Sequence, residues 1–246
     1  EELKAANSSR SSYPAMVRVM DGVLYVWGTN GSTSAIGVAG QSSITTPLAL
    51  DASIFEGERI KMAHVADWST AAMTESGNIY LASTTAWKKI DMSLFGDAVP
   101  VDMNITAQNS IIKAQNPDGS FSWWALRFST GTFSSLTRVD DEVLYTRMKT
   151  VTGKDEVLQD AWTCGNAPTD YIVFTESGKL FAWGDNRRGI AGNSWNNQEG
   201  TEELVKTAQK VEKADAFHVT GRPEFAGRII KQLSMDYATV VVIDDR

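Results

Sequence analysis

Short runs of apolar and β-branched residues recur along the chain, each directly after a turn that contains glycine. The runs read VLYVWG, NIYLAS, SFSWWA and KLFAWG, and they follow Gly22, Gly77, Gly119 and Gly178. Apolar and polar residues alternate only in part within each run, which indicates strands buried on both faces. We interpret the runs as copies of one structural repeat.

The copies share aromatic and small residues at fixed positions. A tryptophan followed by a small residue closes three of the four runs, and Ala82 replaces the tryptophan in the second run. These structural repeat positions are Gly22, Trp27, Gly28, Gly77, Gly119, Trp124, Gly178, Trp183 and Gly184. The turn glycines are expected where the chain needs a positive φ, and the glycine after a tryptophan is expected where a neighbouring backbone comes close.

A second strand signal precedes each turn. Residues 59–77 match residues 228–246 without gaps, with Arg59 opposite Arg228 and Thr70 opposite Thr239. Each unit therefore reads as strand, short turn, strand, tight turn, strand and variable connection. An antiparallel meander repeated every ~40–50 residues is typical of a propeller blade, because stacking around an axis buries both faces of each sheet.

Two stretches carry a family resemblance. Residues 176–192 (ESGKLFAWGDNRRGIAG) and 21–37 (DGVLYVWGTNGSTSAIG) resemble the repeat of the regulator of chromosome condensation family, while 60–83 and 99–125 match it more weakly. The family's usual histidine is absent, and aromatic residues such as Trp68 stand nearby. The resemblance implies an all-β fold, a β-propeller that typically has seven blades.

We expect a small, irregular or partial ring, because four turn-glycine strands are accompanied by five upstream strand sets. Either the strands of 228–245 complete the blade of 21–28, or the chain is part of a larger propeller. A polar arm at 1–12 precedes one predicted propeller domain at 13–246. Insertions are predicted at about 128–154 and 185–227, and the second contains a short amphipathic helix near 201–214.

Composition narrows the possible partners. The net charge is −7 and the sequence pI is near 4.9, so binding to a phosphate backbone is disfavoured. No apolar run is long enough for a membrane helix, and the first residues do not form a signal peptide, so we expect no membrane insertion and leave the compartment open, a virion included. The single Cys164 excludes an intramolecular disulfide.

The sequence contains no recognisable catalytic motif. Neither a Gly-x-Ser-x-Gly elbow nor a Gly-Lys-Ser/Thr phosphate loop occurs, and the spacing of Asp215, His218 and Glu224 fits no metal-ligand pattern. We therefore predict a protein without metal or cofactor that is not an enzyme.

The candidate binding residues lie in the insertion at 185–227. Trp195 stands in a polar stretch where no core periodicity operates, and an exposed tryptophan is suited to anchoring a protein or stacking on a sugar. The predicted interface residues are Arg187, Arg188, Trp195, Asn196, Asn197 and Gln198. Three functions stay open: a scaffold that binds a protein partner, a structural component of a phage or virion particle that contacts neighbouring subunits, and a carbohydrate-binding module.

Overall fold

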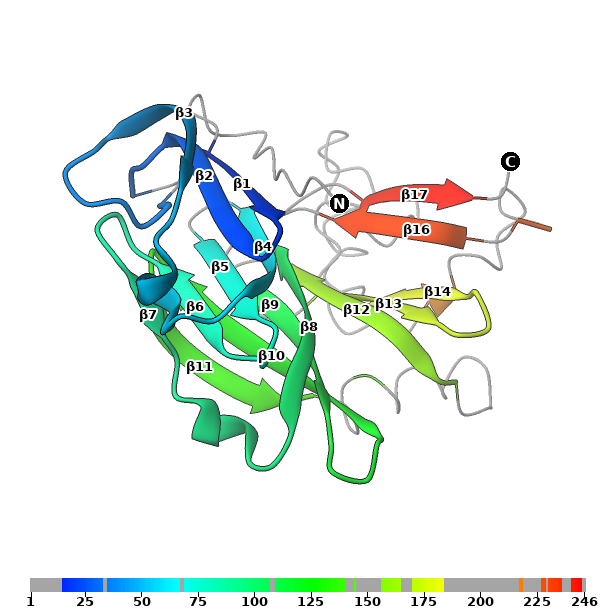
Figure 1. Ribbon diagram of the computed structural model, residues 1–246. Coiled ribbons are helices and arrows are strands. Elements are labelled where there is room, and N and C mark those ends of the chain that lie inside the picture. Colours follow the sequence, from blue (N-terminus) through cyan, green and yellow to red (C-terminus); the bar gives the residue numbers. More distant parts are fainter. Residues whose placement is uncertain are drawn as a thin grey trace, which may run out of the picture. The chain divides into compact units, whose positions relative to one another are not determined.

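Antiparallel strands make up almost all of the regular structure in the computed structural model (Figure 1). The structure describes residues 15–32, 35–66, 69–106, 109–139, 144, 156–164, 170–183, 217–218, 227–228, 230–235 and 240–244. The chain divides into two compact units, Glu1–Arg138 and Val139–Arg246, which are described separately. The predicted helix near 201–214 lies outside the described residues.

Unit 1 (Glu1–Arg138) contains three antiparallel sheets in chain order. The first is β1 (Ala15–Met20), β2 (Val23–Thr29) and β3 (Ser43–Ala49); the second is β4 (Ile60–Ala66), β5 (Ser69–Thr74), β6 (Ile79–Ala82) and β7 (Trp87–Lys89); the third is β8 (Val99–Thr106), β9 (Asn109–Gln115), β10 (Phe121–Ser129) and β11 (Thr132–Arg138). Two short 3₁₀ helices, η1 (Ala52–Phe55) and η2 (Met92–Phe95), lie in the connections between consecutive sheets.

The described residues of unit 2 (Val139–Arg246) form one four-stranded sheet and one hairpin. The sheet is β12 (Leu158–Cys164), β13 (Asp170–Thr175), β14 (Leu180–Trp183) and β15 (Phe217–His218), and the hairpin is β16 (Ile230–Met235) with β17 (Val240–Asp244). Each four-stranded sheet of the chain has its strands in sequence order, as a propeller blade does.

A β-bulge at the same place identifies the first strand of a sheet. It follows Ile60 in β4, Pro100 in β8, Leu158 in β12 and Ile230 in β16. Ile230 therefore corresponds to Ile60, one residue beyond the gapless sequence match. In the strand order of a four-stranded sheet, β16 and β17 correspond to the first and second positions. β1 leads into the Gly22 turn and therefore corresponds to a second position.

The core of unit 1 lies on both faces of the middle sheet. Ala72, Tyr80 and Ala82 belong to the apolar cluster shared with the first sheet. The alternate residues of the same two strands, Ala71, Met73, Ile79 and Leu81, belong to the cluster shared with the third sheet. Strands buried on both faces, as the mixed alternation predicted, are therefore confirmed in this sheet.

Trp87 replaces the tryptophan that the second repeat lacks. It lies directly opposite Ala82 across the β6–β7 ladder. Its ring packs 5.6 Å from Phe55, measured between ring centroids, and Phe55 in turn lies 5.2 Å from Tyr80. A large aromatic side chain thus fills this part of the core, although it comes from the neighbouring strand.

The fourth strands are the elements that the sequence pattern missed. In β11 most side chains are exposed, and β3 is exposed except at Ile44. Because these strands bury little, their sequences carry no apolar alternation, so the repeat pattern predicts only a variable connection there. The insertion predicted at 128–154 therefore requires correction: residues 128–138 complete β10 and form β11 of the third sheet.

The turn glycines adopt the conformation predicted for them. Their φ angles are 79° at Gly22, 92° at Gly77, 86° at Gly119 and 77° at Gly178. At Gly77 an added Cβ would also lie 2.6 Å from the carbonyl oxygen of Pro100 in the next sheet. Backbone conformation therefore requires glycine at all four turns, and close packing between sheets adds to the requirement at Gly77.

Gly37 and Gly40 provide a matched test of packing between sheets. Both have positive φ, 74° and 73°, but a Cβ at Gly37 would overlap the Trp87 indole whereas a Cβ at Gly40 would meet nothing within 4 Å. We expect Gly40→Ala to lower the free energy of unfolding by about 1 kcal/mol and Gly37→Ala to lower it by about 2–4 kcal/mol, measured in urea. Equal losses would contradict the packing described here.

Candidate interaction site

The connections between third and fourth strands are uncharged and tightly organised in unit 1. They span residues 30–42, 83–86 and 130–131, and none contains Asp, Glu, Lys or Arg. The buried amide of Asn30 organises the longest of them. Its nitrogen donates to the carbonyl oxygens of Val38, Gln41 and Thr84 at 2.6, 2.8 and 2.7 Å, while its oxygen accepts from the Ile36 amide at 3.0 Å.

Contacts among these connections link all three sheets of unit 1. The Asn30–Thr84 bond joins the first sheet to the second, and the Trp87 indole nitrogen donates to the Ile36 carbonyl at 3.2 Å. The Thr130 hydroxyl donates to the Ser32 carbonyl at 3.0 Å, which joins the third sheet to the first. Because the loops are fixed in advance, a partner that docks on them loses little loop entropy.

The insertion predicted at 185–227 requires correction at one end, because residues 217–218 form β15; the connection that carries the predicted interface residues joins a third strand to a fourth, as the connections of unit 1 do. It leaves β14 at Trp183 and enters β15 at Phe217, so it joins the third and fourth strands of its sheet. The predicted residues Arg187, Arg188, Trp195, Asn196, Asn197 and Gln198 lie outside the described residues, as does the repeat glycine Gly184.

The remaining repeat aromatics pack as structural residues. Trp183 is buried and stacks on Tyr171, with ring centroids 5.6 Å apart. Trp124 is half-buried and meets Phe95 edge-on at 5.2 Å, and Trp27 packs against the cluster between the first and second sheets. Core packing therefore accounts for these three tryptophans.

The opposite ends of the same sheets are rich in charge. These ends carry the turns 21–22, 75–78 and 116–120 and the connections 50–59 and 90–98, which together we call the acidic end of unit 1. Eight acidic side chains lie there against one basic side chain, Arg59: Asp21, Asp51, Glu56, Glu58, Glu75, Asp91, Asp97 and Asp118.

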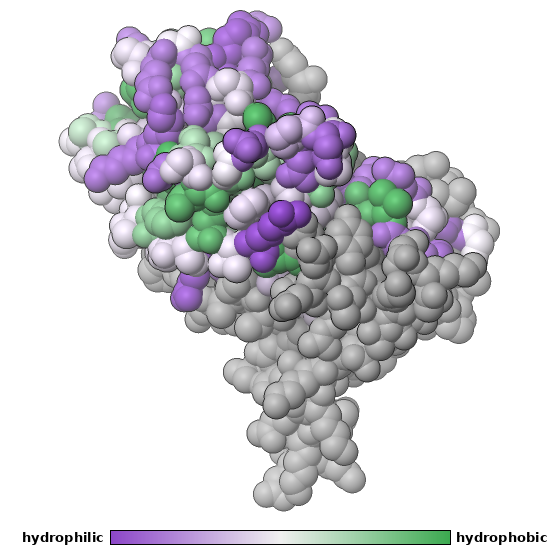
Figure 2. Space-filling model, turned by 90° about the horizontal axis from the view of Figure 1, so that it is seen from below, coloured by the Kyte–Doolittle hydropathy of each residue, from purple (hydrophilic) through white to green (hydrophobic). Residues whose placement is uncertain are grey.

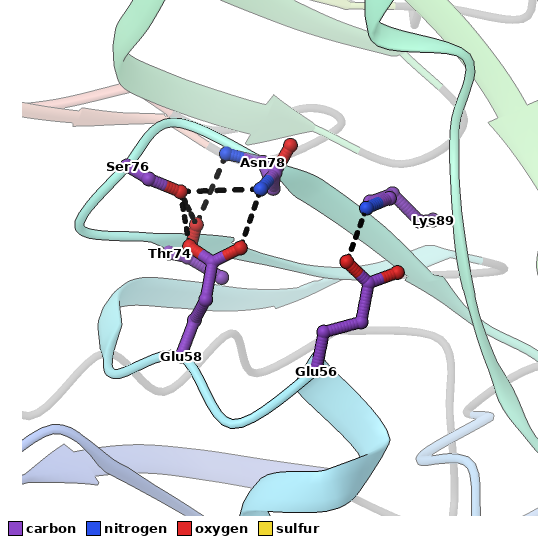
Figure 3. Close-up of polar contacts among 6 residues, drawn as sticks. All are labelled: Glu56, Glu58, Thr74, Ser76, Asn78 and Lys89. Carbon is purple, nitrogen blue, oxygen red and sulfur yellow. Dashed lines mark hydrogen bonds and ion pairs between the residues drawn. The ribbon is translucent and has the colours of Figure 1, made fainter.

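Glu58 holds the turn between β5 and β6 (Figure 3). Its carboxylate accepts a hydrogen bond from the Ser76 hydroxyl and another, at 2.5 Å, from the Asn78 amide nitrogen. Partial burial opposes ionisation, but the hydrogen bonds from Ser76, Thr74 and Asn78 together outweigh it and hold the pKa of Glu58 below its usual 4.5. Beside it, Glu56 forms an ion pair with Lys89 at 2.5 Å.

Unit 2 contains the same arrangement of a glutamate that accepts a hydrogen bond from a serine in the turn, which we call the turn bracket. The glutamate is more buried in unit 2 than in unit 1. Glu156 accepts from the Ser177 hydroxyl at 2.7 Å and pairs with the Lys179 ammonium at 2.5 Å. In both units, therefore, a glutamate two residues before the residue that the β-bulge follows, Ile60 or Leu158, fixes the turn between the second and third strands. The third sheet of unit 1 has Ala98 at this place, and its turn is fixed internally by Asp118 and Ser120.

The described residues contain neither a group of side chains suited to a metal ion nor a helix that could span a membrane. No three His, Cys, Asp or Glu side chains in this part of the chain group together as a metal site would require. Among the same residues, no helix is long and apolar enough to cross a membrane.

No protein-family model and no curated protein matches the sequence. Among solved structures, human WBSCR16 is similar with a TM-score of 0.59 at 13% identity, over 93% of this chain and 55% of that one. Yeast RCC1 (Prp20) bound to Kap60 gives 0.57 at 13%, over 94% and 52%. Prp20p from Saccharomyces cerevisiae gives 0.58 at 14%, over 94% and 53%.

These likenesses define the class of fold. The protein is an all-β chain built of β-propeller blades. The similar structures are propellers of the RCC1 family, so the resemblance predicted from residues 21–37 and 176–192 is confirmed at the level of the fold. The chain spans about half the length of these structures.

Glu58→Gln tests the turn bracket. The amide keeps one acceptor oxygen but places an NH2 donor against either Ser76 or Asn78, so we expect the free energy of unfolding to fall by about 1 kcal/mol, or the Tm by roughly 3 °C, at pH 7. Because the pKa of Glu58 is lowered in the folded protein, its contribution is present above pH 4.5 and is lost as the pH falls through the folded value.

The difference between variant and parent should therefore shrink in acid, as followed by scanning calorimetry. Glu75→Gln is the matched control, because Glu75 is exposed and its pair with Arg59 involves two solvated side chains. A Glu58→Gln penalty that persists unchanged below the pKa would contradict the assigned role of the carboxylate.

Proposed function

We propose that this chain is a non-enzymatic scaffold that binds a partner protein through its third-to-fourth-strand connections. The observation that carries the proposal is the cross-linked loop set around Asn30, in which hydrogen bonds from one loop reach another sheet. Such a set presents a rigid surface, and rigid scaffolds that position variable loops commonly serve recognition.

The connection 184–216, which forms most of the predicted insertion 185–227, is the main docking element in this proposal. It is the longest third-to-fourth-strand connection of the four-stranded sheets, and it contains two adjacent arginines and Trp195. Arginine and tryptophan are enriched among the few residues that dominate binding energy at protein interfaces.

The similar structures support a protein partner without identifying it. Yeast RCC1 is bound to Kap60 in one structure, and the other concerns the binding of Prp20p to Gsp1p and histones. Those partners belong to those proteins. For this chain, which spans about half their length, the proposal is limited to protein binding by the loop-bearing side of the blades.

Substitutions in the insertion test this function. We expect Trp195→Ala combined with Arg187→Ala and Arg188→Ala to weaken capture of the partner by at least about 30-fold, because hot-spot residues each contribute about 2 kcal/mol or more. The measurement is quantitative mass spectrometry of proteins retained by the immobilised chain, followed by titration of the retained protein by calorimetry.

Arg59→Ala with Lys61→Ala is the control, because both side chains are exposed and belong to unit 1, at the end of its sheets opposite the third-to-fourth-strand connections of that unit. The control should retain the partner at full affinity. Equal capture by parent, variant and control, or retention of a glycan instead of a protein, would overturn the proposed function.

A further inference from the structure

We propose that the acidic end of unit 1 is a second interaction surface, which fits a cationic, amphipathic segment of a partner protein. The surface is formed by the second-to-third-strand turns and the connections that hold η1 and η2. It uses no residue of the insertion 185–227, so it stands or falls independently of the function proposed above.

Charge is the first observation. Of the eight carboxylates at the acidic end, Glu56 and Glu75 are paired with Lys89 and Arg59, and Glu58 is engaged in the turn bracket. Five aspartates are exposed and form no ion pair with a described residue: Asp21, Asp51, Asp91, Asp97 and Asp118. Hydrogen bonds from Ser53, Ser93 and Ser120 lower the pKa of Asp51, Asp91 and Asp118, so these three stay ionised.

Apolar exposure is the second, independent observation. Among the described large apolar side chains of unit 1, four that are more than a third exposed lie at this end: Val23, Leu94, Val99 and Phe121, at 37%, 43%, 49% and 42%. The other two, Leu48 and Phe133, lie along β3 and at the opposite end of β11. Figure 2 shows hydrophobic residues separated by hydrophilic ones on the face it presents.

The apolar and acidic groups are interleaved within the third sheet. Val99 and Phe121 both pair with Gln115, so they flank it on the two neighbouring strands. Asp97 precedes Val99 by two residues, and Asp118 precedes Phe121 by three. One side of the Phe121 ring already faces a cation, the Lys113 ammonium, at 4.3 Å from the ring centroid.

Contacts between sheets make this end continuous. The Ile60 amide donates to the Gly22 carbonyl at 2.8 Å, which places the turn 21–22 against the start of β4. A Cβ on Gly77 would lie 3.0 Å from Val99, which places the turn 75–78 against the start of β8. The turns and strand starts of all three sheets therefore form one surface.

The chemistry of the surface selects the partner. Uncompensated carboxylates attract and orient a basic segment, and they repel nucleic acid and anionic lipid. Exposed valine, leucine and phenylalanine gain free energy when covered, at roughly 25 cal/mol per Å² of apolar area. A segment with lysine or arginine on one side and aliphatic residues on the other satisfies both requirements.

The test uses a fluorescein-labelled amphipathic peptide of leucine and lysine as probe, titrated with the full chain by fluorescence anisotropy. We expect binding that weakens as salt is raised. Asp97→Asn with Asp118→Asn should weaken it about fivefold, and Val99→Ser with Phe121→Ser about tenfold. All four side chains are exposed or partly exposed, and calorimetry should show that both variants fold.

The charge-matched control is Gln41→Lys with Thr132→Lys, which raises the net charge by the same amount at or beside the uncharged connections. It should change the affinity less than twofold. Trp195→Ala should leave it unchanged, which separates this surface from the insertion. The proposal is overturned if the probe does not bind, if the two charge variants weaken binding equally, or if a leucine–glutamate peptide binds as well.

Discussion

Each blade-like sheet of this protein must cover two apolar faces, and the rest of unit 1 depends on how the middle sheet meets that requirement. Consecutive residues of β5 and β6 point to opposite clusters, so neither face can be left to solvent. A fully buried side chain such as Met73 or Ile79 contributes about 1.5–3 kcal/mol. The stacking of one sheet on the next is therefore the main source of stability, rather than hydrogen bonding within a single sheet.

The stacking of the sheets also restricts which types of residue the loops can contain. The third-to-fourth-strand connections reach across to the neighbouring sheet, where Asn30 and Thr130 bond to carbonyl oxygens of other loops. A charged side chain at such a contact would lose water without gaining a counterion. The connections that hold η1 and η2 instead bury one aromatic residue each, Phe55 and Phe95, with Ile54 and Met92 partly buried against the same clusters.

The repeat was readable from sequence because its signals are local. A positive-φ glycine, a following apolar run and an aromatic residue occur within a few positions of one another, and the structure places all four turns as predicted. The fourth strands could not be predicted, because β11 and β3 bury little and carry no periodic signal. Trp87 could not be predicted to play this part either. It fills the space that a tryptophan at position 82 would fill, but the sequence does not show that residues 82 and 87 lie opposite each other in the β6–β7 ladder.

The sequence alone predicted one of the two candidate surfaces but not the other. The insertion 185–227 was recognisable by its length and by a tryptophan in a polar stretch, and the structure adds that the connection 184–216 within it joins a third strand to a fourth. The acidic end is assembled from short segments spread from residue 21 to residue 120, and no segment is unusual alone. An aspartate before a 3₁₀ helix is a normal cap, as Asp51 and Asp91 are. Stacking gathers these caps with Asp97, Asp118 and exposed Val99 on one surface. On that surface, covering the apolar side chains is favourable, whereas removing water from the carboxylates is costly unless a cation replaces it, so the combination suits a basic, amphipathic partner.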